Sequence, residues 1–137
     1  MTIARFAAAA LLCVVASTGW AQDRVVYHFD DTVAQGLKGL RSLRNHLDVD
    51  PNAKIVAVAL ADGVDMLMEG AKAANGTEFA PLISALVARG MTFEICELTL
   101  TARGLKKDQF VLDASYTTSG VVRIAKLQGQ GYAYIKP

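Results

Sequence analysis

The sequence has few cysteines and almost no net charge. Two Cys among 137 residues are too few for a disulfide-rich scaffold or a four-thiolate zinc site. The 14 Lys and Arg nearly balance 13 Asp and Glu, and a net charge of +1 favours no nucleic-acid partner. Charged residues make up only 20% of the chain and hydrophobic residues 53%, which excludes an intrinsically disordered protein. The composition is that of one globular domain.

Several common functional motifs are also missing. The first predicted strand leads into HFDDTVAQG, which contains no G-x-G-x-x-G phosphate loop, so we expect no dinucleotide cofactor. No serine lies in a nucleophile elbow. His28, His46 and Cys96 are scattered along the chain and match no metal-ligand spacing, so we expect neither a bound metal nor another cofactor.

The longest uncharged stretch lies at the N-terminus. Arg5 precedes 17 residues without charge, from Phe6 to Gln22, whereas a bilayer-spanning helix needs about 20. Gly19 and Ala21 place small residues at the positions that a signal peptidase requires. We therefore predict a signal peptide at residues 1–21, a domain at residues 22–137, and a periplasmic or secreted protein that is free of the membrane after cleavage. The alternative is an uncleaved N-terminal anchor.

Cleavage after Ala21 changes both the net charge and the number of cysteines. It removes Arg5, so 13 basic residues face 13 acidic ones, and it removes Cys13. Cys96 is then the single cysteine. In an exported protein such a residue is a buried small hydrophobe, a partner in an intermolecular disulfide, or a reactive thiol.

The rest of the chain alternates between two hydrophobic periodicities. Leucines at spacings of three and four from Leu37 to Leu47 predict an amphipathic helix, and Pro81 and Gly90 bracket a second one. The KIVAVALA run at 54–61 is apolar on both faces, as a strand between two helical layers is. Strands are predicted at 24–29, 54–61, 91–100 and 121–127, helices at 33–47, 64–74, 80–89 and 102–110, a polar connection at 116–120, and an edge strand or docked extension at 129–137. This order predicts an α/β fold, with a mostly parallel sheet covered by helices on both faces.

In such a sheet, functional residues gather at the carboxyl ends of the strands. These ends lie along one edge of the sheet, here called the carboxyl rim. Three segments are expected along the carboxyl rim: 28–31, 61–63 and 96–100. Asp30 and Asp31 are most simply helix caps. His46, at the end of the first helix, is expected to stabilise the helix C-terminus.

Cys96 is the candidate functional residue of the rim, and packing is the competing interpretation. Glu94 and Glu97 would raise the pKa of its thiol, whereas the N-terminus of a helix following Thr99 would lower it. His28 is either a hydrogen-bonded strand residue or a partner that activates the thiol of Cys96.

Four segments carry a family resemblance: VVYHF, RNHLDVDP, TFEIC and TSGVVRIAKLQGQGYAYIKP. With them, the chain from Val25 to Pro137 resembles the exported branch of the DsrE/DsrF-like sulfur-relay family. The resemblance implies a three-layer α/β/α sandwich with a five-stranded sheet, assembled into trimers or hexamers. It also implies that Cys96 carries sulfur as a persulfide. Exported relatives often have Asn followed by Thr shortly after this cysteine, and here Leu98 stands at the Asn position before Thr99.

Three functions follow from these features. The first is sulfur carriage by Cys96 between a donor protein and an acceptor protein, without turnover in isolation. The second is an oligomeric module that binds a small ligand or partner, with Cys96 only packing. The third is a thiol- or metal-dependent enzyme that uses Cys96 with His28.

Overall fold

The computed structural model describes residues 22–137, so the predicted signal peptide lies outside the described residues. Five strands form one sheet in the order β4-β3-β2-β1-β5, and every neighbouring pair is parallel. The strands are β1 Arg24–Asp31, β2 Lys54–Asp62, β3 Thr92–Cys96, β4 Ala114–Thr117 and β5 Ala133–Ile135. The helices are α1 Thr32–Val49, α2 Ala80–Val87, α3 Glu97–Arg103 and α4 Gly120–Gly129, with 3-10 turns η1 Gly63–Leu67 and η2 Lys107–Gln109.

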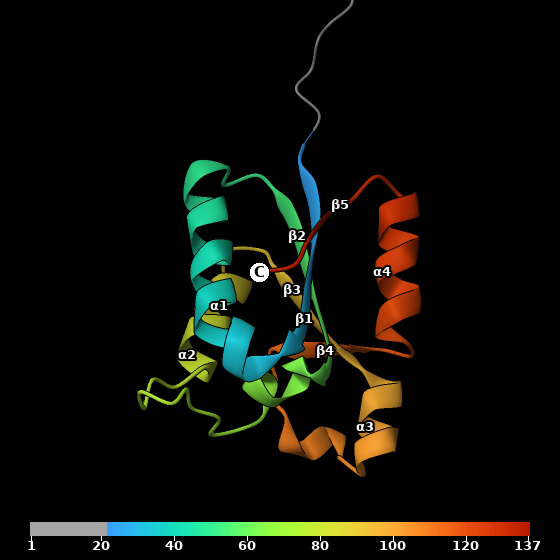
Figure 1. The fold of residues 1–137 in the computed structure, drawn as a ribbon. Coiled ribbons are helices and arrows are strands. Elements are labelled where there is room, and N and C mark those ends of the chain that lie inside the picture. Colours follow the sequence, from blue (N-terminus) through green and yellow to red (C-terminus); the bar gives the residue numbers. More distant parts are fainter. Residues whose placement is uncertain (1–21) are drawn as a thin grey trace, which may run out of the picture.

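The helices form layers on the two faces of the sheet. Helices α1 and α2 cover one face and α4 covers the other, while α3 lies at one end of the sheet (Figure 1). This arrangement confirms the predicted α/β class and its five-stranded parallel sheet. Among residues 22–137, no helix combines the length and the apolar character that crossing a bilayer requires.

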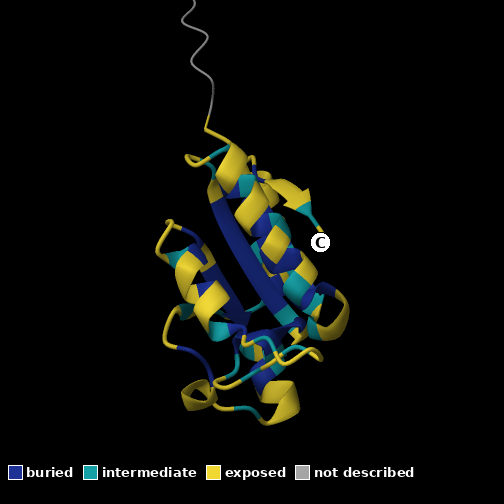
Figure 2. Ribbon diagram, turned by 90° about the vertical axis from the view of Figure 1, so that its left-hand side faces the viewer, coloured by how far each residue is buried: buried dark blue, intermediate teal, exposed yellow. Residues whose placement is uncertain are grey.

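Alternate residues of the central strands belong to two separate hydrophobic cores, one on each face of the sheet. Tyr27 and Phe29 of β1 pack with α1 and α2 in the larger core, whereas Val26 packs with Ile124 and Leu127 of α4 in the smaller one. The sheet between the helices is therefore buried on both faces (Figure 2). This explains why the sequence of β2 is apolar throughout instead of alternating.

Two strand predictions are wrong, and helix geometry explains both. The segment 121–127 is β-branched at its start, but it forms α4: Ile124 and Leu127 are buried three residues apart while Val121 and Val122 face solvent. The predicted strand at 91–100 ends at Cys96, and Glu97 begins α3.

Three neighbouring predictions are also corrected. The helix predicted at 64–74 is only the 3-10 turn η1, and the one at 102–110 is replaced by the end of α3 followed by η2. The connection predicted at 116–120 contains the end of β4, an edge strand whose Ser and Thr residues do not resemble a buried strand. The tail does form an edge strand, β5, which pairs with β1.

Because all the strands are parallel, their carboxyl ends meet at one edge of the sheet. Asp31 pairs with Asp62 across β1 and β2, and Cys96 pairs with Thr117 across β3 and β4. The three segments expected along one rim therefore do lie there.

Candidate functional site

Cys96 lies at the junction between β3 and α3, on the carboxyl rim. It is the last residue of the strand and the N-cap residue of the helix. Its side chain is 5% exposed and is on the sheet face that α4 covers. The sequence predicted this position on the rim. The contacts of the thiol come both from α4, distant in the chain, and from α3, which directly follows Cys96.

The closest of these contacts is with the first turn of α4. The backbone N–H of Gly120 donates a hydrogen bond to Cys96 Sγ at 3.2 Å. A Cβ atom at position 120 would lie 2.9 Å from Leu60 Cδ2 and 3.3 Å from the Cβ of Cys96. Glycine therefore lets the helix backbone approach the sulfur closely enough to donate to it.

A second group of donors comes from α3 itself. The hydroxyl of Thr99 and the backbone N–H groups of Leu98 and Thr99 lie near the thiol and lower its pKa through hydrogen bonding. Thr99 Oγ1 also accepts the N–H of Ala61 at 3.1 Å, which fixes the hydroxyl between β2 and Cys96. Each of these donors stabilises a sulfur that carries negative charge.

These contacts determine the pKa of the thiol. Burial alone raises the pKa of Cys96, but the hydrogen bonds from Gly120, Thr99 and Leu98 outweigh it, and the pKa is lowered overall. The two neighbouring carboxylates do not counteract this, because each has a cationic partner. Glu94 accepts two hydrogen bonds from Arg123 at 2.7 and 2.8 Å, and Glu97 pairs with Lys107.

The backbone beside the thiol is strained at one residue. Ala61 has φ of 48°, the one non-glycine residue with positive φ in the described part of the chain. Its N–H is held by Thr99 and its carbonyl by Arg103, whose guanidinium also contacts Asp65 at 2.8 Å. Strained residues of this kind cluster at functional sites. No sequence pattern indicated Ala61 or Arg103.

His28 does not join Cys96. The two residues lie on β1 and β3, with β2 between them, and strands two apart are roughly 10 Å from each other. His28 Nδ1 instead lies 2.7 Å from the hydroxyl of Tyr134, while its Nε2 is buried without a hydrogen-bond partner among residues 22–137. Burial lowers the pKa of His28, and this effect exceeds the opposite effect of the negative charge on Asp30, which raises the pKa. The structure therefore provides no Cys–His pair.

Asp30 and Asp31 have different roles. Asp31 caps α1, because its carboxylate accepts the N–H of Ala34 at 2.9 Å. Asp30 instead accepts from Lys136 at 2.6 Å, which lowers the pKa of the carboxyl group and ties the C-terminal tail to β1.

His46 lies in the last turn of α1, near the amino ends of the strands and away from the carboxyl rim. Its Nδ1 lies 3.0 Å from the hydroxyl of Tyr27 on β1. His46 is the basic residue of the last turn, the position from which it was expected to stabilise the helix C-terminus. One donor atom each of Asp23, His46 and Asp50 lies within 4.8 Å of the others, a grouping that the sequence spacing did not indicate. Acidic groups at a surface are common without an ion, and we assign no metal to them.

A hollow of about 590 Å³ opens between β4 and the start of α4, and Cys96 itself does not line it. Ser119, the N-cap of α4, lines it next to Gly120. Arg123 and Lys126 make its helical wall basic. The rim thus combines a thiol with a depressed pKa, converging hydrogen-bond donors and an adjacent polar hollow.

Fold and rim together define a small parallel α/β protein that, within residues 22–137, has a single cysteine, buried at the carboxyl edge of the sheet. The model of the DsrE/DsrF-like family matches residues 3–137, and the chain belongs to this family. Comparison with curated proteins gives no significant match.

Two solved structures share the fold. A protein of unknown function, MTH1491 from Methanobacterium thermoautotrophicum, is 30% identical with a TM-score of 0.76, over 85% of this chain and 100% of that one. The ychN protein from E. coli is 16% identical with a TM-score of 0.69, over 85% and 99% of the two chains.

Proposed function

We propose that this protein carries sulfane sulfur as a persulfide on Cys96, taking it from a donor protein and passing it to an acceptor protein. The observation that carries the proposal is the hydrogen bond from Gly120 N–H to Cys96 Sγ, reinforced by Thr99. Only a thiolate attacks sulfane sulfur, and a lowered pKa increases the thiolate fraction at neutral pH. The family supports this role without specifying the donor or acceptor.

The transfer conserves atoms and electrons without an external oxidant. The thiolate of Cys96 attacks the outer sulfur of a donor persulfide, R–S–SH, and a new S–S bond forms at Sγ. The donor S–S bond breaks, and the donor thiolate leaves with its electron pair. An acceptor thiolate then attacks the outer sulfur on Cys96, whose thiolate is the leaving group. Because a thiolate of low pKa leaves readily, the same hydrogen bonds assist loading and release.

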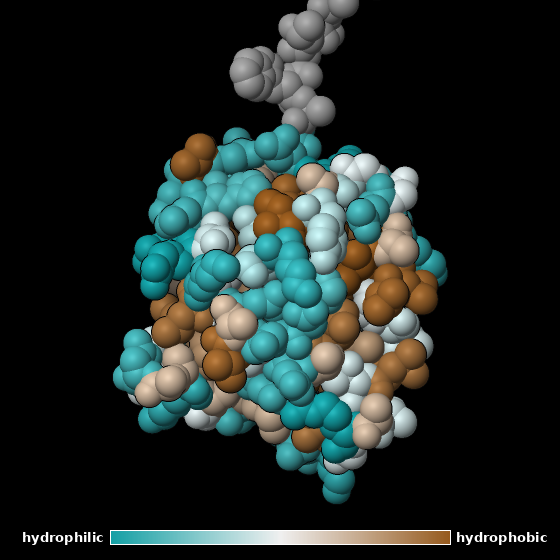
Figure 3. All heavy atoms as spheres, in the orientation of Figure 1, coloured by the Kyte–Doolittle hydropathy of each residue, from teal (hydrophilic) through white to brown (hydrophobic). Residues whose placement is uncertain are grey.

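An apolar surface surrounds the thiol. Leu98, Val121 and Val122 are 57%, 66% and 50% exposed, and they belong to the two helix starts that meet at Cys96. Hydrophobic side chains gather over α4 and toward α3 (Figure 3). This surface is suited to contact with a donor, an acceptor or a second subunit, which supports carriage between proteins and assembly into an oligomer.

Leu98 in place of Asn is compatible with the chemistry. Its side chain points to solvent, and its N–H donates to the Thr118 carbonyl at 3.1 Å while also helping to lower the pKa of Cys96. Any non-proline residue supplies that N–H. The thiol environment therefore does not depend on an amide side chain at this position.

Loading is tested by intact-mass spectrometry after exposure of the reduced protein to polysulfide. We expect a gain of about 32 Da, one sulfur atom, that disappears on reduction. Cys96→Ser is the control, and it also separates Cys96 from Cys13 if residues 1–21 remain attached. An unmodified wild-type mass under conditions that load an established persulfide carrier would contradict the proposal.

The low exposure of Cys96 favours a second candidate, an oligomeric binding module in which the thiol only packs. Maleimide labelling of the native protein separates the two. A carrier is labelled under native conditions, whereas a packing cysteine reacts only after denaturant is added. In the second case Cys96→Ser changes stability and leaves binding intact.

We further propose that the protein acts outside the cytoplasm after removal of residues 1–21. The support is the Arg5 charge, the uncharged segment and the small residues at Gly19 and Ala21. N-terminal sequencing of the protein from the exported fraction is expected to begin at Gln22. An intact Met1 in that fraction would show an uncleaved anchor instead.

A further inference from the structure

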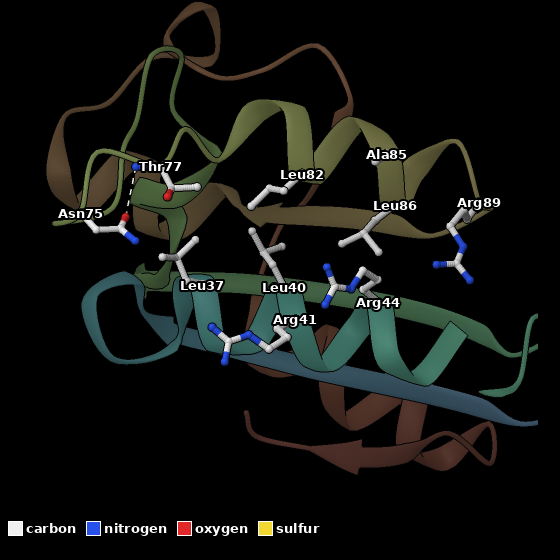
Figure 4. A pocket seen from close by; sticks show the side chains of 10 residues that line it. All are labelled: Leu37, Leu40, Arg41, Arg44, Asn75, Thr77, Leu82, Ala85, Leu86 and Arg89. Atoms are coloured by element: carbon white, nitrogen blue, oxygen red, sulfur yellow. Dashed lines mark hydrogen bonds between the residues drawn. The ribbon is translucent and has the colours of Figure 1, made fainter. Parts of the chain in front are cut away.

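A mostly apolar hollow lined by arginines lies between α1 and α2, on the opposite face of the sheet from Cys96. The cavity has a volume of about 350 Å³. Leucines from both helices form its walls, with Leu40 and Leu86 buried and Leu82 partly exposed. Figure 4 shows these side chains facing one another across the space between the two helices.

Three arginines stand around this apolar space. Arg89, at the end of α2, is already neutralised by Asp48 at 2.7 Å. Arg41 and Arg44 of α1 form no ion pair with any residue in the described range 22–137. Arg44 extends from α1 into the gap beside Leu40 (Figure 4). The cavity therefore presents two uncompensated guanidinium groups next to a hydrocarbon surface.

From this juxtaposition we propose that the cavity binds a small amphipathic anion, a single hydrocarbon chain that ends in a carboxylate. The leucines would receive the chain and Arg41 and Arg44 the carboxylate. Guanidinium groups bind carboxylates through paired, charge-assisted hydrogen bonds. Ligand pockets typically combine mostly apolar walls with a few placed polar groups.

The volume indicates the size of the ligand. At roughly 30 Å³ for each heavy atom at liquid density, the cavity holds about a dozen heavy atoms. A saturated carboxylate of about ten carbons has that size. A second hollow of about 420 Å³ shares Leu37 and Arg41 with this cavity and adds Lys38. The positive charge therefore extends along α1, and the local field attracts an anion.

Charge also argues against a second copy of this chain as the occupant. In a two-fold symmetric contact across this cavity, Arg41 and Arg44 of each subunit would face the same arginines of the other, and no acidic residue among residues 22–137 lines the cavity to separate them. A small carboxylate supplies the missing negative charge without this repulsion. The site lies on the opposite sheet face from Cys96, so it is independent of sulfur carriage.

Isothermal titration calorimetry with decanoate tests this site in the purified protein. We expect one bound decanoate per chain, with 1-decanol at least about tenfold weaker because it lacks the charge. The double variant Arg41→Gln/Arg44→Gln should lose about tenfold or more in affinity. Lys54→Gln removes one exposed cation from the start of β2, outside the cavity, and should bind like the wild type.

A second variant tests the apolar half of the cavity. Ala85 lines the cavity from the exposed side of α2, so Ala85→Phe fills the space without removing a charge or a core contact. Loss of decanoate binding in this variant, with an unchanged melting temperature, supports the site. Equal affinity of decanoate for wild type, Ala85→Phe and the double arginine variant would overturn it. Absence of decanoate binding, together with a changed oligomeric mass in the double variant, would show that a second copy fills the cavity.

Discussion

At the scale of single residues, the sulfur of Cys96 depends on two hydrogen-bond donors from outside its own strand. Gly120 supplies a backbone N–H from α4, and Thr99 supplies a hydroxyl that is itself oriented by Ala61. Burial and these donors act in opposite directions on the pKa, and the donors prevail. The reactivity of the thiol should therefore respond to substitutions that leave Cys96 untouched.

Thr99→Val is expected to raise the pKa of Cys96, because it removes the hydroxyl that bonds to the thiolate. The pKa is read from the rate of iodoacetamide alkylation as a function of pH, compared with the urea-unfolded chain. Thr101→Val is the matched control, because Thr101 lies on the same helix and its hydroxyl donates to the Glu97 carbonyl. Identical pH profiles for wild type and Thr99→Val would contradict the assigned hydrogen bond.

The lowered pKa also predicts the direction of a pH effect on stability. The folded thiol loses its proton at a lower pH than the unfolded one, so its contribution to stability is fully present above the unfolded pKa. It is lost as the pH falls through the folded pKa. The difference in unfolding free energy between wild type and Cys96→Ser should accordingly grow toward alkaline pH, as measured by urea denaturation across that range.

Strain at Ala61 gives a second prediction. Its φ of 48° lies in the left-handed region, which glycine occupies without steric cost. Ala61→Gly should raise the free energy of unfolding by about 0.5–1 kcal/mol, since relief of strain exceeds the entropy that glycine adds to the unfolded chain. Ala59→Gly, on the same strand at ordinary φ, should instead destabilise the protein. Chemical denaturation of both variants measures the effect, and a loss of stability in Ala61→Gly would show that the backbone is not strained there.

The sequence predicted Cys96, its rim and a nearby helix N-terminus that lowers the thiol pKa, although α3 begins at Glu97 and not after Thr99. It did not predict the contact with Gly120. A cysteine at the end of an apolar segment can be recognised from its neighbours in the chain. The contact with Gly120 cannot, because it depends on how closely α4 packs against β2 and β3. His28 was the partner that the sequence suggested, and the strand order keeps the two side chains apart. Its partner Tyr134 lies on β5, whose pairing with β1 was left open.

At the scale of secondary-structure elements, the start of α4 matters most, because it delivers Gly120 to the sulfur. Ser119 is the N-cap, and its hydroxyl oxygen accepts the N–H of Val122 at 3.4 Å. Arg123, one turn further, anchors the helix to Glu94 of β3. These two contacts fix the first turn of the helix against the strand that carries Cys96.

Ser119→Ala should cost about 1 kcal/mol of stability through loss of the cap. It should also slow alkylation of Cys96 at neutral pH, because a frayed first turn no longer holds the Gly120 N–H in place. Ser119→Asp is the control that keeps a capping oxygen, and it should restore both properties. If Ser119→Ala loses the expected stability but Cys96 is alkylated at the wild-type rate, then the first turn of α4 does not control the reactivity of the thiol.

The elements that sequence patterns predicted well were those with a clear period and flanking signals. The leucine stripe of α1 and the Pro81 and Gly90 positions around α2 are such cases. The errors fell where one local signal competed with another. In the 121–127 segment, β-branched residues favoured a strand, whereas the Ser119 cap and the three-residue spacing of Ile124 and Leu127 favoured the helix that forms. β4 was missed because an edge strand need not be apolar.

At the scale of the whole molecule, the two faces of the sheet carry different surfaces. The α4 face has the thiol with exposed apolar side chains around it, whereas the α1–α2 face has the leucine cavity with its arginines. This division permits contact with other proteins on the α4 face, near the sulfur, and binding of a small anion on the α1–α2 face. It also indicates which surface should govern assembly.

In the proposed oligomer, Val121→Asp is expected to reduce the oligomeric mass, since it places a charge within the apolar surface around the thiol. An acidic residue in the first turn of a helix is favourable, so the fold of α4 should be preserved. Leu112→Asp is the matched control, because Leu112 is 99% exposed but lies outside α3 and α4. Size-exclusion chromatography with light scattering reports the mass. A larger decrease for Leu112→Asp than for Val121→Asp would place the interface elsewhere.

The most direct test of sulfur carriage follows the intact mass through loading and release in one experiment. Reduced protein is loaded with polysulfide, freed of excess reagent and then treated with cyanide, which takes the outer sulfur as thiocyanate and leaves the Cys96 thiolate. We predict a species about 32 Da heavier that returns to the starting mass with release of about one thiocyanate per chain, and no such species in Cys96→Ser. A wild-type protein that stays unmodified, or that gains the mass equally in Cys96→Ser, would contradict a persulfide carrier at Cys96.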